Sequence, residues 1–488
     1  MDQSNRLIPS IYDGSILWWG LVIWMVASIA VLMPLEPNDY WWYLRVGRDT
    51  LHDGAVPVVD TLSHTQAGRP VVYHSWLAAV LFYLIRLWGG DGLTMLCKAL
   101  LLGILYALTW STCRIVGAGG RLSSLITWLA ALASSNNWAV RPQIWAYPLF
   151  SLTLLVLLYK PKKIVSLWLL PAIMVLWVNL HGSFVLGFFL VGTAWVGERE
   201  RRRELGVALG SMSIASLINP RGLGAWHYVL TMLTDPSSQQ LGTEWHAPTP
   251  DTWQNVLFFV WLLSLTPLLF ELARNRRTAL PDLSLTWWLW FLGFGWMALT
   301  GLRYVIWFIL ILAPLSAMLL APLVGQWLDR RPPRGLPALN AGIAIALLLM
   351  PLILLPGVRE RWWKAAPPSW TANTPGQATR WLAEHPELPG PLWSDIAFAS
   401  YLTFALPERP VWSDTRLEVY SLEQSLRYIE ISNAVYNWQE LLDTEGIQLL
   451  MIDPHAQPRL WKAVQRSPHW TVRYQDDTAI ILTRLPDK

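Results

Sequence analysis

The sequence predicts a mainly α-helical fold: a polytopic transmembrane bundle of about 11–13 helices, followed by a small external α/β domain. Several of the expected helices are shorter than the ~20 residues that a perpendicular helix needs to cross a bilayer. Three observations favour this fold class. Apolar residues make up 53% of the chain and charged residues only 14%, whereas water-soluble domains keep about a quarter of their residues charged. Long apolar runs alternate with short polar segments, and the composition becomes that of a soluble domain from about Arg359 onward.

The apolar runs define the expected membrane spans. The first run, Ser15 to Met33, is long enough to cross a bilayer and ends without a small-residue cleavage site, so we expect a retained helix. Further runs cover residues 76–88, 93–111, 122–133, 145–159, 164–178, 184–196, 205–217, 256–272, 283–300, 304–324 and 336–355. The run 76–88 is the weakest, and we expect it to be re-entrant or interfacial, because counting every run as a span conflicts with the charge pattern.

That charge pattern consists of four basic segments between the runs, at residues 160–163, 198–204, 274–277 and 330–334. The positive-inside rule places all four in the cytoplasm. Residues 1–356 then form a multi-pass module in the cell (plasma or inner) membrane, with a long first external loop at 34–75. Residues 357–488 form a soluble extracytoplasmic domain.

Composition also excludes several classes of function. The net charge is only +4, and the basic residues form short clusters without interleaved aromatic rings, so we expect no nucleic-acid partner. The two cysteines, Cys97 and Cys113, lie in or beside one apolar run without metal-ligand spacing, so we expect no disulfide. Many of the 33 tryptophans flank the apolar runs, as in the aromatic belts of membrane proteins.

In the C-terminal domain, helix and strand signals alternate. Thr374 and Pro375 are typical of an N-cap and first turn, and predict a helix through Leu382. Ser421 predicts the start of another helix toward Ile431. Short apolar runs at 391–393, 410–412, 448–452 and 478–482 are typical of strands.

The first external loop carries the leading candidate for catalysis, Asp39. A carboxylate just after a membrane helix lies where a lipid-linked substrate presents its head group, and it can act as a general base toward a hydroxyl. Nearby arginines could pair with a phosphate leaving group. Asp is also a favoured N-cap residue, and these residues alone favour a helix cap over a catalytic base.

Several short segments follow one another in order along nearly the whole chain: Asn38-Asp39-Tyr40-Trp41-Trp42, Val56 to Ser63, His74 to Leu77, Val140-Arg141-Pro142-Gln143, Trp177 to Gly182, Asn219-Pro220-Arg221-Gly222 and Val411 to Arg416. In these segments and their order the chain resembles the GT-C superfamily of membrane glycosyltransferases. These segments look like those of a bacterial branch similar to the dolichyl-phosphate-mannose and aminoarabinose transferases.

The resemblance implies a specific chemistry. In that superfamily an aspartate in the first external loop is the catalytic residue, and sugars pass from polyprenyl-phosphate donors to acceptor hydroxyls, usually with inversion. Asp39 would be the general base, and the partners would be a polyprenyl-phosphate-linked sugar, a hydroxyl acceptor and the lipid bilayer. Many members carry adjacent acids where this chain has Asn38, and no second acidic motif is evident, so we expect no metal and no cofactor.

Eight further residues are candidates for substrate binding. For the phosphate, Arg303 is favoured because it stands between two strongly apolar runs, although arginines at helix ends also extend to lipid head groups. Asn179 and His181 flank a tight turn at Gly182 and suit either ligand binding or the capping of helix-end backbone groups. The full set is His74, Arg141, Gln143, Asn179, His181, Arg221, Glu244 and Arg303.

Charged residues of the C-terminal domain are a weaker set. Asp395, Asp414, Arg416 and Glu418 follow strand-like segments, where ligands bind in α/β domains. Solvated loop charges are the commoner explanation of such residues.

Two other functions stay open. A transporter or flippase of a lipid-linked precursor would also need a polar cavity among helices, but such proteins often contain related halves, and no internal repeat is visible. A non-catalytic relative acting in envelope assembly would be favoured by loss of the first-loop acid, and Asp39 is present.

Overall fold

The fold is described from a computed structural model that covers residues 7–159, 168–274, 281–328, 336–388 and 390–485. These residues form two compact units. The helical unit comprises Met1–Met33, Gly89–Ala225 and Thr243–Ala366. The mixed unit comprises Pro34–Trp88, Trp226–Gly242 and Pro367–Lys488. Residues 34–75, which were expected to be a loop of the membrane module, therefore lie in the mixed unit.

The helical unit is built from apolar α-helices joined by short turns. Its helices are α1 (Ser15–Leu32), α4 (Gly120–Ala133), α5 (Gln143–Tyr159), α6 (Leu169–Leu180), α7 (Phe184–Gly197), α8 (Arg202–Ala215), α11 (Trp253–Arg274), α12 (Leu285–Thr300), α13 (Val305–Leu328) and α14 (Pro337–Leu349). Short 3₁₀ turns are η2 (Ser135–Asn137), η4 (Arg199–Arg201), η5 (Thr243–Trp245), η6 (Leu302–Tyr304), η7 (Met350–Leu354) and η8 (Arg359–Arg361). These bounds agree closely with the apolar runs.

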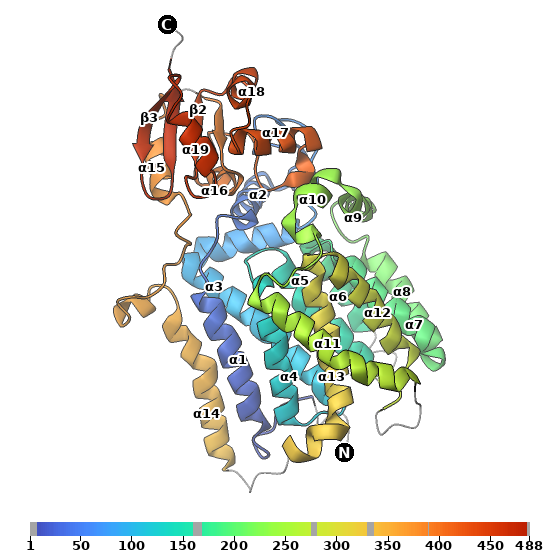
Figure 1. The fold of residues 1–488 in the computed structure, drawn as a ribbon. Helices are drawn as coiled ribbons and strands as arrows, with labels where there is room; N and C mark the ends of the chain where they lie inside the picture. Colours follow the sequence, from blue (N-terminus) through green and yellow to red (C-terminus); the bar gives the residue numbers. More distant parts are fainter. Residues whose placement is uncertain (1–6, 160–167, 275–280, 329–335, 389, 486–488) are drawn as a thin grey trace. The chain divides into compact units, whose positions relative to one another are not determined.

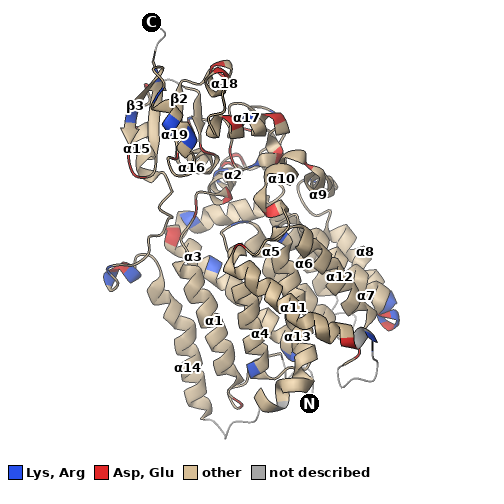
Figure 2. Ribbon diagram, viewed as in Figure 1, with Lys and Arg blue, Asp and Glu red and all other residues tan. Residues whose placement is uncertain are grey.

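Several of these helices are long and apolar enough to cross a membrane. Among the described residues, five such segments occur: Ser15–Leu32, Trp76–Ile115, Trp253–Glu271, Leu302–Gly325 and Pro337–Leu354. Shorter apolar helices lie beside them in the sequence. Figure 2 shows α1 and α14 without charged residues, whereas charges gather on the C-terminal elements. The protein is a multi-pass membrane protein.

Packing within the helical unit follows this apolar character. Helix α1 packs against α4 and α14, and α13 packs against α4 and α12 (Figure 1). Helix α13 is the central element, since nearly every side chain from Val305 to Ala317 is buried. Two buried cations meet the C-terminal end of α1: Lys98 donates to the carbonyl of Met33 (3.0 Å) and Arg359 to that of Val31 (3.3 Å). Cations there complement the negative end of the helix dipole.

Helix α3 (Trp76–Ile115) connects the two units. The label covers two helices that meet at a kink, and the weak run 76–88 lies in the first of them. Gly90 interrupts the helix with φ 56° and ψ −146°, a backbone conformation that suits glycine. The boundary between the mixed and helical units lies at the same place, between Trp88 and Gly89.

The mixed unit joins the first loop to the C-terminal domain. Helix α2 (Asp39–Asp53) packs against α16 (Ile396–Ala405). A Cβ at Gly47 would lie 2.2 Å from the carbonyl oxygen of Ala79, so glycine permits close contact between α2 and the first part of α3. Two helices inserted between the membrane segments also contribute to this unit, α9 (Gly224–Thr234), from Trp226 onward, and α10 (Pro236–Leu241).

A four-stranded sheet forms the core of the C-terminal part. Its strands are β1 (Leu392–Ser394), β2 (Leu449–Ile452), β3 (Trp470–Gln475) and β4 (Ile480–Arg484), in the order β1-β2-β4-β3. Strands β1 and β2 are parallel, and the other two pairs are antiparallel. The remaining elements are α15 (Gly376–Ala383), η9 (Leu417–Val419), α17 (Leu422–Ser432), α18 (Trp438–Thr444) and α19 (Pro458–Val464).

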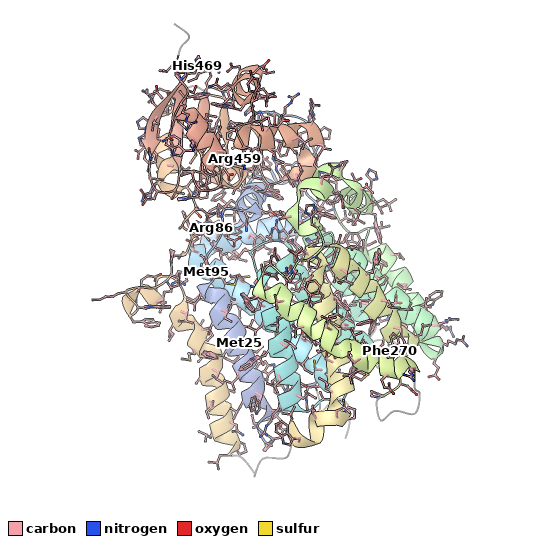
Figure 3. The ribbon with its side chains drawn as sticks, in the orientation of Figure 1. Met25, Arg86, Met95, Phe270, Arg459 and His469 are labelled. Atoms are coloured by element: carbon pink, nitrogen blue, oxygen red, sulfur yellow. The ribbon has the colours of Figure 1, made fainter. Side chains whose placement is uncertain are left out.

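Both faces of this sheet are covered. Leu449 and Met451 pack with residues of α15 and α16, whereas Leu450 and Ile452 pack with residues of α17, α18 and α19. This alternation is the period of two expected for a strand. In Figure 3 the side chains of Arg459 and His469 belong to this part of the chain, and those of Met25 and Phe270 to apolar helices of the helical unit.

The fold class is therefore confirmed, with local differences. Ser421 caps α17 by accepting a hydrogen bond from the Gln424 amide (3.1 Å). The run 410–412 is not a strand, because Val411 makes only isolated bridges to Ser63 and Leu392. Of the four basic segments, 198–204 is described; residues 160–163, 275–277 and 330–334 lie outside the described residues.

Candidate active site

The first residues of α2 show which side chain caps this helix. Asn38 is the N-cap, and its side chain accepts a hydrogen bond from the amide of Tyr40 (3.2 Å). Asp39 is the first residue of the helix, where a carboxylate is favoured by the positive end of the helix dipole. Its carboxylate is thus available for contacts other than the N-cap bond.

Two donors from the mixed unit orient that carboxylate. The hydroxyl of Thr415 donates to Oδ1 of Asp39 at 2.6 Å, and the indole Nε1 of Trp42 donates to the same oxygen at 3.4 Å. Thr415 also exchanges a hydrogen bond with Ser400 (2.8 Å). The 2.6 Å between the Thr415 hydroxyl and the Asp39 carboxylate lies within the range expected between a hydroxyl and a general base.

A buried ionic network fixes this loop against residues 60–73 of the same unit. Arg416 is 1% exposed; it contacts Asp414 through its Nε and Nη2 (2.7–3.1 Å) and Asp60 through Nη1 (2.6 Å). Nη1 also donates to the hydroxyl of Tyr73 (2.7 Å). Burial opposes ionisation of Asp60, yet Arg416 holds the pKa of that carboxyl below its ordinary value. Burial raises the pKa of the Tyr73 hydroxyl.

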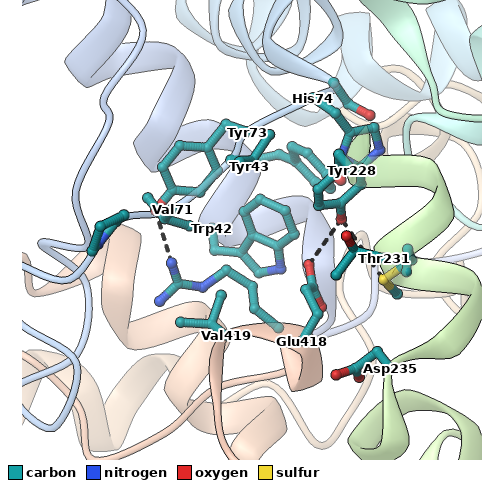
Figure 4. Close-up of a pocket in the computed structure, with 15 residues that line it drawn as sticks. Trp42, Tyr43, Val71, Tyr73, His74, Tyr228, Thr231, Asp235, Glu418 and Val419 are labelled. Atoms are coloured by element: carbon teal, nitrogen blue, oxygen red, sulfur yellow. Dashed lines mark hydrogen bonds between the residues drawn. The ribbon is translucent and has the colours of Figure 1, made fainter. Parts of the chain in front are cut away.

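A cavity of about 250 Å³ lies beside this network (Figure 4). Trp42 lies at its centre, with Glu418 next to the indole ring and Tyr228 of α9 facing Glu418. The Tyr228 hydroxyl donates to the Glu418 carboxylate at 3.3 Å, and its ring stacks on His74 at 4.3 Å. Burial raises the pKa of Glu418 to about 7. All of the lining residues belong to the mixed unit.

The helical unit contains a second polar cluster, which brings together three of the candidate residues. Glu244 accepts a hydrogen bond from Arg141 at 2.7 Å and has a weaker ion pair with Arg303 at 3.8 Å. The guanidinium of Arg303 lies 4.1 Å from the centre of the Trp245 ring. Burial opposes ionisation of Glu244, yet Arg141 and Arg303 lower its pKa.

The other candidates of the helical unit make contacts elsewhere. Asn179 donates to the carbonyls of Val175 and Ile218, both at 2.8 Å. The His181 ring pairs with Ser183 and accepts from its amide (3.0 Å). These contacts match the capping role weighed for the turn. Gln143 begins α5, and the Arg221 amide donates to the Asn219 side chain.

The contributions of Thr415, Trp42 and Tyr228 to the site are not evident from the sequence. No local pattern marks Tyr228, which lies in an apolar helix between membrane segments. Asp414 and Arg416 are buried and are not solvated loop charges. Among the described residues, no group of three or more His, Cys, Asp or Glu side chains could hold a metal ion.

Solved structures identify the fold. The chain is similar to the archaeal oligosaccharyltransferase AglB from Archaeoglobus fulgidus, solved with an inhibitory peptide and a dolichol-phosphate, with a TM-score of 0.56 and 11% identity over 94% of this chain and 74% of that one. It is also similar to ArnT from Cupriavidus metallidurans in the apo state, with a TM-score of 0.52 and 14% identity over 97% of this chain and 98% of that one.

A third similar structure is the mycobacterial arabinofuranosyltransferase AftD, with a TM-score of 0.53 and 14% identity over 96% of this chain and 40% of that one. No sequence-family model matches the chain, and no curated protein matches it in sequence. The three structural neighbours are GT-C glycosyltransferases. At these identities the likeness establishes a shared GT-C fold.

Proposed function

We propose that this protein is a membrane glycosyltransferase that moves a sugar from a polyprenyl-phosphate donor to a hydroxyl acceptor on the external face, with inversion. The observation that carries the proposal is the environment of Asp39. Asn38 caps α2, whereas the Asp39 carboxylate receives hydrogen bonds from Thr415 and Trp42. These contacts favour a positioned base over a helix cap. The shared fold with GT-C glycosyltransferases supports the reaction class.

The proposed reaction is a single displacement. Asp39 takes the proton of the acceptor hydroxyl while its oxygen forms a bond to the anomeric carbon. The bond between that carbon and the phosphate oxygen breaks, and its electron pair leaves with the polyprenyl phosphate. Attack from the face opposite the leaving group inverts the anomeric configuration. Proton removal by a positioned side chain contributes roughly 10²–10⁴-fold to such a rate.

For the leaving phosphate, we propose Arg141 and Arg303. Both cations are gathered around one carboxylate, Glu244, so the cluster carries an excess positive charge. Arginine suits phosphate because its planar guanidinium can donate two parallel hydrogen bonds. In this proposal the phosphate replaces Glu244 as the partner of the two arginines.

The test is transfer of labelled sugar by the purified full chain in lipid. A panel of polyprenyl-phosphate sugars would be incubated with envelope lipid, polysaccharide and protein fractions as acceptors. Asp39→Asn should lower transfer by roughly 10²–10⁴-fold, since Asn cannot accept the proton. Asp53→Asn, on the exposed C-terminal end of the same helix, is the matched control and should retain wild-type transfer.

Two outcomes of this assay would contradict the proposal. Wild-type turnover by Asp39→Asn would overturn Asp39 as the base. Movement of the labelled lipid across the bilayer by the wild type, without any sugar transfer, would favour a flippase instead.

A further inference from the structure

Most side chains that line the cavity of the mixed unit have no role in the proposed displacement reaction. One side is aromatic: Trp42 and Tyr43 stack with 3.6 Å between ring centres, and His74 and Tyr228 form a second stacked pair at 4.3 Å. Small-molecule sites are typically lined by such rings with a few polar groups that fix orientation. Flat aromatic faces suit a ring that exposes C–H bonds on its faces and hydroxyls on its edge.

The polar groups on the opposite side are acceptors. Glu418 and Asp235 line the cavity, and Asp235 is held in place because it caps α10 by accepting from the Ser238 amide (2.7 Å). The one cation in the lining is Arg416, whose charge is matched by two carboxylates, Asp60 and Asp414. The carboxylate of Asp235, and that of Glu418 in its ionised form, disfavour a phosphate and favour donors such as sugar hydroxyls.

Volume limits the occupant further. At about 250 Å³ the cavity is smaller than the roughly 300–1,000 Å³ of sites that bury drug-sized ligands. One six-membered or five-membered sugar ring fits this space better than an oligosaccharide or a lipid tail does.

The indole of Trp42 connects the cavity to the proposed base. Its ring faces the cavity, and its Nε1 donates to the carboxylate of Asp39 (3.4 Å). A ring held against Trp42 would therefore contact a side chain that is itself hydrogen-bonded to the Asp39 carboxylate.

From these observations we propose that the cavity is a binding site for a single uncharged sugar ring, stacked on Trp42 and hydrogen-bonded through its hydroxyls to Glu418 and Asp235. The inference rests on the proposed function, because it assigns a substrate class to the same site. The ring belongs to the acceptor or to the sugar of the donor, and both sources offer the same chemistry.

Saturation-transfer NMR on the full chain in lipid nanodiscs tests this site without requiring turnover. The probes are methyl glycosides of neutral hexoses and pentoses at millimolar concentration, with a hexose phosphate as the charged contrast. We expect saturation transfer to at least one neutral glycoside and weaker transfer to the hexose phosphate. Glu418→Leu should abolish the signal, and Glu418→Gln, which keeps hydrogen bonding, should retain it.

Two further variants control for the possibility that Glu418→Leu loses the signal because it misfolds. Thr231→Trp fills the cavity from an exposed position on α9 and should also abolish the signal. Glu440→Gln, an exposed glutamate of the same unit, should leave it unchanged. No signal from the wild type, equal signals from the wild type and Thr231→Trp, or preference for the hexose phosphate would overturn the proposal.

Competition between the glycoside and polyprenyl-phosphate compounds shows whether the bound sugar ring belongs to the donor or to the acceptor. If a polyprenyl-phosphate sugar displaces the glycoside while bare polyprenyl phosphate does not, the cavity holds the donor sugar. If neither displaces it, the cavity holds the acceptor.

Asp39→Asn should still bind the glycoside, so loss of sugar transfer with retained glycoside binding separates the role of the base from that of the cavity. Sugar transfer by the wild type without any glycoside binding would overturn the cavity proposal and leave the proposed function intact.

Discussion

Arg416 is a buried cation held between two buried carboxylates, Asp60 and Asp414. Removing the cation would leave both carboxylates without their ionic partner in a poorly solvated place. We expect Arg416→Met to lower the free energy of unfolding of the mixed unit by about 3–5 kcal/mol. The denaturant midpoint of the purified chain, followed by protease accessibility of the C-terminal part, measures this loss.

The matched control is Arg427→Met. Arg427 also pairs with two carboxylates, Glu423 and Glu445, but its side chain is 37% exposed. Exposed ion pairs contribute only about 0–1 kcal/mol because water screens them. Equal losses in the two variants would contradict the structural role given to Arg416.

Glu418 makes stability depend on pH. Burial raises the pKa of its carboxyl from the ordinary 4.5 to about 7 in the folded protein, so folding disfavours its ionisation. Below about pH 4.5 the carboxyl is protonated in both states, and its contribution to stability is fully present; that contribution is lost as the pH rises toward about 7. The melting temperature of the wild type should therefore fall relative to Glu418→Gln across this window. A constant difference between the two proteins would contradict the raised pKa.

At the scale of elements, the close approach of α2 and α3 depends on Gly47. A Cβ there would lie 2.2 Å from the carbonyl oxygen of Ala79 and 3.0 Å from the Cβ of Tyr83, so the helices must separate to admit it. We expect Gly47→Ala to destabilise the mixed unit by about 1–3 kcal/mol, as overpacking does elsewhere. Thermal melting of the purified protein checks this.

Gly192 on α7 supplies the comparison. A Cβ at that position meets nothing within 4 Å, and its backbone is helical. Gly192→Ala should be neutral or stabilise the protein by about 0.5–1 kcal/mol, because alanine loses less conformational freedom on folding. Destabilisation of the same size in both variants would mean that contact with Ala79 is not the cause.

The elements themselves were predictable to different degrees. The apolar helices were located because a long apolar run specifies a membrane helix almost by itself. Strand β3 was missed, since most of its residues are exposed or half-exposed and it carries no apolar run. The run 410–412 suggested a strand because its residues are buried, but Val411 forms only single bridges.

At the scale of the whole molecule, the candidate site was only partly predictable. Asp39 could be singled out from its place after the first helix. Its hydroxyl partner, Thr415, is 376 residues away, and no local sequence pattern indicates such a contact. Glu418 was weighed as a loop charge, and Tyr228 stood in no motif. Contacts between distant segments depend on tertiary packing, which periodicity and spacing do not encode.

Orientation in the membrane stays a prediction from the basic segments. Cysteine variants in a background lacking Cys97 and Cys113 would test it. Glu440→Cys, on exposed α18, should react with a membrane-impermeant maleimide in intact cells, because we expect the C-terminal domain outside. Glu200→Cys, in an expected cytoplasmic segment, should react only after permeabilisation. The opposite labelling pattern would reverse the assignment.

The ion pair of Arg416 with Asp60 joins residues 356 positions apart. A ribosome adding roughly 5–20 residues per second makes Arg416 roughly 20–70 seconds after Asp60. Throughout that interval the growing chain inserts its membrane helices while the loop bearing Asp39 lacks the partners that later orient it. A nascent chain therefore reaches the bilayer, and the lipids dissolved in it, well before the cavity has all of its walls. Synthesis order alone delays assembly of the proposed site until Thr415 and Arg416 have left the ribosome.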